Sequence, residues 1–338
     1  MKRINISMSV AALAVSLAVT WTFAQAQSAG EVTQTFNLKP GWNAVYLEVQ
    51  PEPRDPATVF GGLTDMESAW TWLSRESAAE FIQNPSEGLW GQPGWNAYFN
   101  QTDFRSKLTN LYAVLGNQAY LIKMKNTAPA GGTSWQVTGA PSMRKTRWLT
   151  DSFNMVGFHL DPNNSPTIAA YFAPSSAQAG QAVYRLNNLS GKWEFVQNPS
   201  ATPLQSGAAY WVYSEGSSTY QGPLGVDLPM SDGLLFGDGL TRLTVTLSNL
   251  SAVTRTVTFT PSGNVVLYYR EWDVTEGYFT WKPLGQMPAV AIQPESSRNV
   301  WLEVHREQMV AGLSKSVLEI ADDKGGRIRV PVIAEKIQ

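Results

Sequence analysis

Residues 38–51 read LKPGWNAVYLEVQP, and residues 149–162 read LTDSFNMVGFHLDP. Both stretches are mainly apolar and end at a proline, and Trp42 of the first aligns with Phe153 of the second. Proline cannot donate a hydrogen bond inside a sheet, so it marks the end of a buried strand. The chain therefore contains one strand motif twice, which predicts an internal repeat.

Three further segments recur in the same order in both copies. They are FIQNPS at 81–86 and FVQNPS at 195–200, GNQAYLI at 116–122 and SGAAYWV at 206–212, and the pairs Trp135-Gln136 and Tyr220-Gln221. Short aromatic or β-branched runs, which are typical of strands, precede the Asn-Pro turn in each copy. Residues 56–63 and 165–172 are predicted to form single helical turns after the first strand.

The two copies differ mainly between residues 86 and 115, where copy one is longer. We expect residues 33–140 to form β-module copy one, with an insertion near 86–115, and residues 147–228 to form β-module copy two. Insertions usually map to surface loops, and loops often carry function. The insertion is therefore the first place to look for a binding site.

From residue 239 onward, apolar and polar residues alternate regularly, as in Leu243, Val245 and Leu247 with threonines between them. This period of two is typical of half-buried antiparallel strands. Residues 322–326 (DDKGG) are predicted to form a hairpin turn. The predicted fold is all-β, with two tandem homologous small β-modules and a C-terminal immunoglobulin-like β-sandwich at 239–338.

The chain begins with a basic residue pair, an apolar stretch and the sequence Ala24-Gln25-Ala26. This pattern predicts a signal peptide at residues 1–26, cleaved near Ala26. Later segments fall short of the ~20 consecutive apolar residues that a spanning helix needs, so we expect no transmembrane segment after cleavage. The expected location is exported: extracellular, at the cell surface or in the periplasm.

Composition narrows the classes of chemistry. A net charge of -2 gives no electrostatic footprint for nucleic acid, so no nucleic-acid partner is expected. The chain has no cysteine, which excludes disulfides and thiolate zinc ligands. Charged residues make up 15% of the chain, against a typical ~25%, which favours strands and turns over surface helices.

Two parts of the sequence resemble known exported proteins. The doubled pattern that begins with Gly41-Trp42-Asn43 and ends with Ala209-Tyr210-Trp211 resembles GWN...GYW-type β repeats of exported multidomain surface proteins. The tail resembles the end of an immunoglobulin-like sandwich domain of bacterial surface proteins. These resemblances imply a surface or extracellular setting and assign no catalytic residue.

Candidate catalytic and metal-binding residues are few. The two histidines, His159 and His305, lie in different expected domains, so no triad, zinc site or other metal site is predicted. His159 is expected to be a solvated strand residue at the position where copy one has Glu48. Aspartates near glycine-rich turns, at 227, 232, 238 and 322–323, fit turn formation better than calcium binding.

The insertion carries a cluster of aromatic residues, Trp90, Trp95, Tyr98 and Phe99, among glycine, proline, asparagine and glutamine. Flat rings can stack on sugars, and amides suit sugar hydroxyls, so these four residues are the candidate ligand-binding site. The alternative is that the rings fold the insertion back as a lid over a small core. The repeat tryptophans are expected in the core: Trp42, Trp72, Trp193 and Trp211.

The leading functional hypothesis is a non-catalytic exported structural, adhesion or interaction protein, without a cofactor, that contacts other surface proteins or glycans. The first alternative is a carbohydrate-binding protein that uses the aromatic residues at 90–99. The second is a polysaccharide-active enzyme, which requires two carboxylates about 5–10 Å apart. Copy one offers five acidic residues for such a pair, whereas copy two has only Glu194 at the aligned Asn-Pro region; the five are Glu48, Asp65, Glu67, Glu80 and Glu87.

Overall fold

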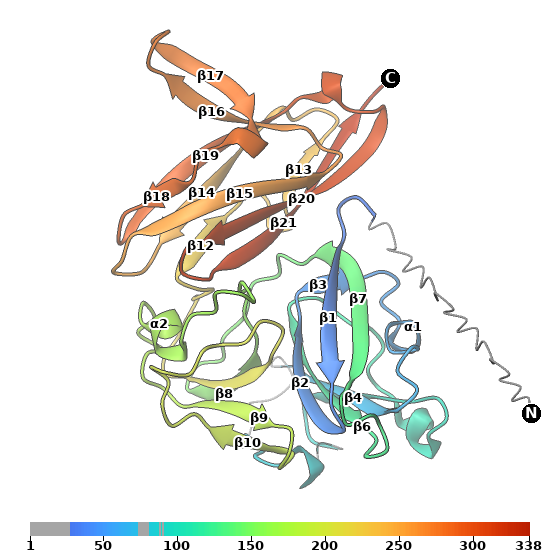
Figure 1. Ribbon diagram of the computed structural model, residues 1–338. Coiled ribbons are helices and arrows are strands. Elements are labelled where there is room, and N and C mark those ends of the chain that lie inside the picture. Colours follow the sequence, from blue (N-terminus) through green and yellow to red (C-terminus); the bar gives the residue numbers. More distant parts are fainter. Residues whose placement is uncertain (1–27, 74–80, 88, 90) are drawn as a thin grey trace, which may run out of the picture.

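The computed structural model describes residues 28–73, 81–87, 89 and 91–338. Two small β-modules lie next to each other, and the C-terminal part forms a larger β-sandwich that packs against them (Figure 1). Helices are limited to short turns in the described residues. The all-β prediction is confirmed.

Module one contains two sheets, with strand orders β2-β6-β4-β5 and β1-β7-β3. The elements are β1 (Val32–Leu38), β2 (Gly41–Leu47), β3 (Val49–Pro51), α1 (Pro56–Val59), β4 (Met66–Trp72), η1 (Pro85–Glu87), β5 (Trp95–Phe99), η2 (Phe104–Leu108), β6 (Gln118–Met124) and β7 (Thr133–Pro141). Alternate residues of β2 and β6, such as Val45 and Tyr120, are buried in a core that also contains Trp135. The period of two in these strands thus gives the module its core.

Module two has one sheet, with the order β10-β9-β11-β8. Its elements are β8 (Ser152–Val156), α2 (Ile168–Phe172), β9 (Val183–Asn187), β10 (Lys192–Phe195) and β11 (Tyr210–Ser214). The order repeats β5-β4-β6-β2 of module one, and the register also matches, since Val45 pairs with Tyr120 and Val156 with Tyr210. The internal repeat is therefore present in both topology and register.

The repeated asparagines explain why the strand motif recurs. Asn43 and Asn154 are both buried. The backbone N–H of Lys39 donates to Asn43 Oδ1 at 2.8 Å, and that of Leu149 donates to Asn154 Oδ1 at 2.7 Å. In return, Asn43 Nδ2 donates to the carbonyl of Lys39, and Asn154 Nδ2 donates to the carbonyl of Leu149. The side chain thus satisfies the backbone of the turn that enters the strand, which a buried apolar residue could not do.

The two short helices also match the sequence prediction. The helical turns expected within 56–63 and 165–172 are α1 and α2, which begin after Asp55 and Thr167. Each of these residues caps its helix by accepting a backbone N–H with its side-chain oxygen. The caps explain where both helices begin.

The structure differs from the sequence prediction in the insertion. Instead of a surface loop, residues 86–115 contain β5, which pairs with β4 in the position that β10 has beside β9. The matching Asn-Pro segments therefore do not occupy equivalent positions in the two modules. Residues 81–86 come before β5, whereas residues 195–200 come after β10, the strand equivalent to β5. Without β5, β4 would be an edge strand with an unpaired backbone edge.

The two modules share one aromatic core. The four-stranded sheets of both modules contribute to a single buried cluster, in which Trp211 packs 5.4 Å from Trp72 and 6.2 Å from Trp193 between ring centroids. The four tryptophans predicted to be core residues, Trp42 among them, are buried. Each module therefore covers an apolar face of the other.

Equivalent positions of the two copies meet at this interface. The offset that relates Asn43 to Asn154 also relates Tyr46 to Gly157 and Glu48 to His159. A Cβ atom on Gly157 would lie 2.1 Å from Cγ of Tyr46, and Glu48 Oε2 lies 3.7 Å from His159 Nδ1. Contacts between equivalent positions are typical of a two-fold arrangement.

The C-terminal sandwich has two five-stranded sheets, ordered β12-β14-β19-β16-β17 and β13-β21-β20-β15-β18. The elements are β12 (Leu224–Asp227), β13 (Leu234–Gly237), β14 (Arg242–Asn249), β15 (Arg255–Gly263), β16 (Leu267–Asp273), β17 (Tyr278–Pro283), η3 (Leu284–Gln286), β18 (Val290–Ile292), β19 (Ser296–Val304), η4 (Arg306–Gln308), β20 (Gly312–Asp322) and β21 (Arg327–Lys336). The predicted boundaries at 228 and 239 are too late, because β12 pairs with β14 and β13 with β21. Both strands complete edges of the sandwich.

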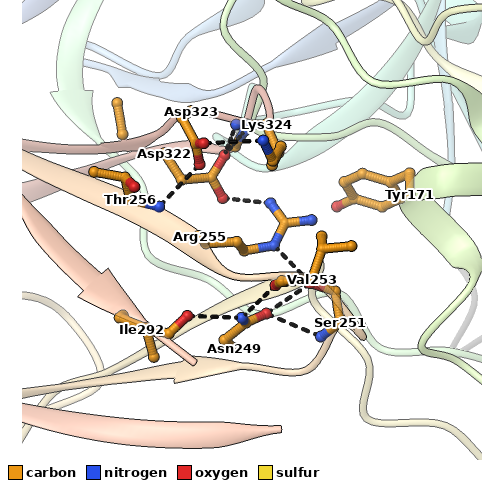
Figure 2. Close-up of polar contacts among 12 residues, drawn as sticks. Tyr171, Asn249, Ser251, Val253, Arg255, Thr256, Ile292, Asp322, Asp323 and Lys324 are labelled. Carbon is orange, nitrogen blue, oxygen red and sulfur yellow. Dashed lines mark hydrogen bonds and ion pairs between the residues drawn. The ribbon is translucent and has the colours of Figure 1, made fainter. Parts of the chain in front are cut away.

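The predicted hairpin turn at 322–326 is confirmed, and a buried ion pair holds its first residue (Figure 2). Asp322 Oδ1 accepts the backbone N–H groups of Lys324 and Gly326, both at 2.9 Å. Asp322 Oδ2 lies 2.5 Å from Nη1 of Arg255, and the two side chains are 0% and 5% exposed. The carboxylate therefore shapes the turn and pairs with a buried cation at once.

This turn attaches the sandwich to module two. The backbone N–H of Asp161 donates to the carbonyl of Gly325 at 3.0 Å, and the Nδ2 of Asn164 donates to the carbonyl of Asp323 at 3.1 Å. A Cβ atom on Gly325 would lie 1.8 Å from the carbonyl oxygen of Asn164. Glycine is required here because the two backbones approach so closely.

Candidate functional site

The structure buries most of the sequence-predicted site. Trp95, Tyr98 and Phe99 are 8%, 8% and 2% exposed, and Trp90 lies outside the described residues. Trp95 and Phe99 face the core shared by the modules, whereas Tyr98 faces the core of module one and stacks on Phe60. These three rings therefore do not form an exposed stacking platform; they pack in cores, which is the alternative stated above. Their insertion contains a paired strand with a core on each face.

A different group of rings is exposed on the outer side of the sandwich. In β16 the side chains of Leu267 and Tyr269 are buried, so Tyr268, Arg270 and Trp272 point to the opposite side. Pairing with β17 and β19 adds three more rings to this side. We call these six residues the aromatic face: Tyr268, Arg270, Trp272, Phe279, Trp281 and Trp301.

Contacts within the aromatic face fix its rings. The Arg270 guanidinium carbon lies 3.8 Å from the ring centroid of Phe279 and 5.4 Å from that of Trp301. Trp272 meets Phe279 edge-on at 5.0 Å. Trp272, Phe279 and Trp301 nevertheless stay 51%, 46% and 41% exposed. Stacking on a cation thus orients the rings and leaves much of each accessible.

A strip of neutral polar residues continues from the aromatic face across β14 and β19. Thr244 pairs with Trp301 across the two strands, Thr246 with Asn299 and Ser248 with Ser297. The side-chain oxygens of Thr246 and Asn299 are 2.8 Å apart. The same side of the sheet therefore combines exposed rings with hydroxyl and amide groups.

The charges around the aromatic face are largely engaged. Arg242 lies over Trp281 and pairs with Glu303, which also lies 3.2 Å from Nε2 of His305. His305 stacks on Tyr268, with ring centroids 3.6 Å apart. The face thus presents rings and neutral groups with little unpaired charge.

A second polar group lies where the three parts of the molecule meet. Glu48 is buried, and its Oε2 lies 3.7 Å from His159 Nδ1 and 4.0 Å from Arg327 Nη2. Three atoms here have no hydrogen-bond partner among the described residues: Glu48 Oε1, His159 Nδ1 and Arg327 Nε. His159 lies after the end of β8, and its side chain is 23% exposed, so it is half-buried between the parts and not a solvated strand residue.

A cleft of about 490 Å³ opens beside this polar group, between the modules. The linker between them crosses it, and the lining includes Tyr46, Asn117 and Arg144. Asn117 Nδ2 donates to the carbonyls of Ser142 and Arg144. Asn117 therefore fixes the linker, and the cleft follows from how the modules are joined.

Sequence reasoning missed the aromatic face, although a signal was available. Residues 268–272 read YYREW and residues 278–283 read YFTWKP. Trp272 and Arg270 fall at every second position, on the side opposite the buried Leu267 and Tyr269. Aromatic residues on both sides of one strand indicate a core face and a second apolar face.

The described part of the chain contains no group of three or more histidine, aspartate or glutamate side chains placed to hold a metal ion. In the same residues, no helix has the length and apolar character needed to cross a bilayer. Asp322, named above among the turn aspartates, forms the hairpin turn and pairs with Arg255.

Comparisons with known proteins give weak structural similarities. No protein-family model and no curated protein matches the chain. The PapD-like domain 7 of human CEP192 matches at 8% identity and a TM-score of 0.24, covering 34% of this chain and 86% of that domain. The periplasmic chaperone SfaE matches at 10% identity and a TM-score of 0.23, covering 33% and 56%.

A further match spans most of both chains. A DUF4785 family protein from Legionella pneumophila is 9% identical with a TM-score of 0.18, covering 90% of this chain and 89% of that one. At such TM-scores these similarities assign neither a function nor a family.

Proposed function

We propose that the protein is an exported, non-catalytic interaction protein that binds its partner through the aromatic face. The observation that carries this proposal is the exposure of Trp272, Phe279 and Trp301 together on one sheet surface. Contiguous apolar patches are uncommon on soluble proteins and usually mark interaction sites. Tryptophan, tyrosine and arginine, the main components of this face, also dominate measured binding energies.

The rigidity of the molecule supports a role in structure or adhesion. The two modules share a core, and the turn that begins at Asp322, held by an ion pair inside the sandwich, attaches the sandwich to module two through hydrogen bonds from Asp161 and Asn164. A face on such a body is held in a fixed position relative to the modules. Binding then loses less conformational entropy than binding by a loop.

Export is supported by the signal-peptide pattern at residues 1–26. Expression with a C-terminal tag in a Gram-negative host tests it. We expect the tagged protein outside the cytoplasm, with Gln27 as its first residue in N-terminal sequencing. Full-length protein retained in the cytoplasm would argue against export.

Binding is tested by sedimenting purified protein (residues 27–338) with cell envelopes of the source organism. We expect co-sedimentation, and the double variant Trp272→Ala/Trp301→Ala should stay in the supernatant. Tyr112→Ala is the matched control, because Tyr112 is 78% exposed in module one, outside the aromatic face. Equal sedimentation of the wild type and the double variant would refute a role for the aromatic face.

A further inference from the structure

The shape of the aromatic face restricts what it can bind. It lies on the side of a sheet where neighbouring strands place Trp301, Arg270 and Trp272 next to one another. Exposed indole rings offer flat apolar surfaces with a polar edge. The apolar C–H faces of sugar rings match such surfaces, and their hydroxyls need hydrogen-bonding groups beside the rings.

Those hydrogen-bonding groups are present next to Trp301. Thr244, Thr246 and Ser248 follow one another on the outer side of β14, and Asn299 and Ser297 lie opposite on β19. At ~3.3 Å per residue, the distance from residue 244 to residue 248 is roughly 13 Å. Hydroxyl and amide side chains both donate and accept, as sugar hydroxyls do. The strip is long enough to follow a chain of sugars rather than a single ring.

The charge pattern favours an uncharged ligand. Arg242 already pairs with Glu303, and Asp227, which lies opposite Thr246, pairs with Lys145. Arg270 lies against two rings and keeps its positive charge without a carboxylate partner among the described residues. A strongly anionic or cationic partner would find few free charges of opposite sign here. The Coulomb energy gained on binding would therefore not offset the cost of removing the partner's charges from water. An uncharged polyol has no such requirement.

On these grounds, and resting on the proposed function, we propose that the aromatic face binds an uncharged polysaccharide. Trp301 and Trp272 stack on sugar rings, and Arg270 keeps the neighbouring rings oriented. Thr244, Thr246 and Asn299 hydrogen-bond the hydroxyls of the sugars that follow. The binding surface is therefore in the sandwich and not in module one.

The test is isothermal titration calorimetry of residues 27–338 with soluble xyloglucan, galactomannan and mixed-linkage β-glucan, and with polygalacturonate as an anionic polymer. We expect at least one uncharged polymer to bind, and to bind more tightly than polygalacturonate. Trp301→Ala and Trp272→Ala should each weaken binding roughly tenfold, as expected when a stacking ring is removed. Trp301→Phe, which keeps a ring, should retain more affinity, and Tyr112→Ala should bind as the wild type.

The inference is overturned if none of these uncharged polymers binds, if polygalacturonate binds most tightly, or if the tryptophan variants bind as well as the wild type. Envelope sedimentation separates this failure from failure of the proposed function. Binding to envelopes that survives protease treatment of the envelopes, but is lost after their oxidation with periodate, supports a glycan as the partner. Binding lost after protease, but still dependent on Trp301, overturns the glycan and leaves the interaction function intact. Dimers that Trp301→Ala dissociates in sedimentation velocity would identify a second copy as the occupant and also overturn the glycan.

Discussion

The buried ion pair between Arg255 and Asp322 leads to a quantitative prediction. Replacing Asp322 by alanine leaves the guanidinium of Arg255 in a site where its side chain is 5% exposed. Removing one partner of a buried pair costs about 3–5 kcal/mol. The change also removes the acceptor of two backbone N–H groups, at Lys324 and Gly326. We expect Asp322→Ala to lower the free energy of unfolding by about 4 kcal/mol or more.

Urea titration followed by tryptophan fluorescence measures this loss, and hydrogen exchange of β15 and β20 locates it in the sandwich. Asp322→Asn keeps an acceptor for the turn, so it should cost less than Asp322→Ala. The double variant Arg255→Met/Asp322→Asn should recover part of the loss, because it removes both charges.

Glu319 and Arg329 provide the matched control on the same two strands, β20 and β21. Their ion pair is more exposed, with side chains 34% and 21% accessible, so Glu319→Ala should cost about 0–1 kcal/mol. A loss below about 1 kcal/mol for Asp322→Ala, similar to that of Glu319→Ala, would refute the reasoning that burial sets the magnitude.

Three further predictions concern the contacts between the parts. Gly325→Ala should separate the sandwich from module two, because φ at this residue is +92° and the new Cβ would meet the carbonyl oxygen of Asn164. Faster proteolysis at the junction, with the sandwich core still intact, would show this separation. Resistance to proteolysis equal to that of the wild type would contradict it. Gly157→Ala should cost about 1–3 kcal/mol in urea unfolding, because the added methyl overlaps the ring of Tyr46, and the further change Tyr46→Ala should relieve part of the loss. Burial raises the pKa of Tyr46 and Tyr171 above the ordinary value near 10, so the folded state holds these two protons more tightly than the unfolded state does. Their contribution to the free energy of unfolding is therefore complete below pH 10 and should be lost as the pH rises above 10. Absorbance at 295 nm should then show tyrosines that ionise only on alkaline unfolding, whereas full ionisation near pH 10 in the folded protein would contradict their burial.

The sequence predicts the local features of this fold well. The repeated strand motif, the two helical turns and the turn at 322–326 each depend on contacts between nearby residues, so their patterns can be read directly. The burial of Trp193 and Trp211 follows from their place in repeated apolar runs. The fold class rests on such local signals.

The features that sequence reasoning missed depend on long-range pairing. Residues 95–99 become a strand because β4 lacks a second neighbour until β5 pairs with it. The burial of Trp95 follows from that pairing and not from its glycine- and proline-rich surroundings. In β16, Tyr269 and Trp272 are both aromatic, and only the packing of the second sheet decides which side is the core. The contact of Glu48 with His159 requires both copies to be folded together.

The meeting of equivalent positions has a consequence for the history of the chain. A single ancestral copy would have exposed the aromatic surface that now forms the shared core, so it would have been a homodimer, stable only as a pair. After duplication and fusion, the two copies could carry different residues at equivalent positions. A large ring at position 46 now fits against a glycine at 157, whereas a symmetric dimer would have placed two identical residues there. Copy one expressed alone should therefore regenerate the ancestral state and associate with itself or aggregate.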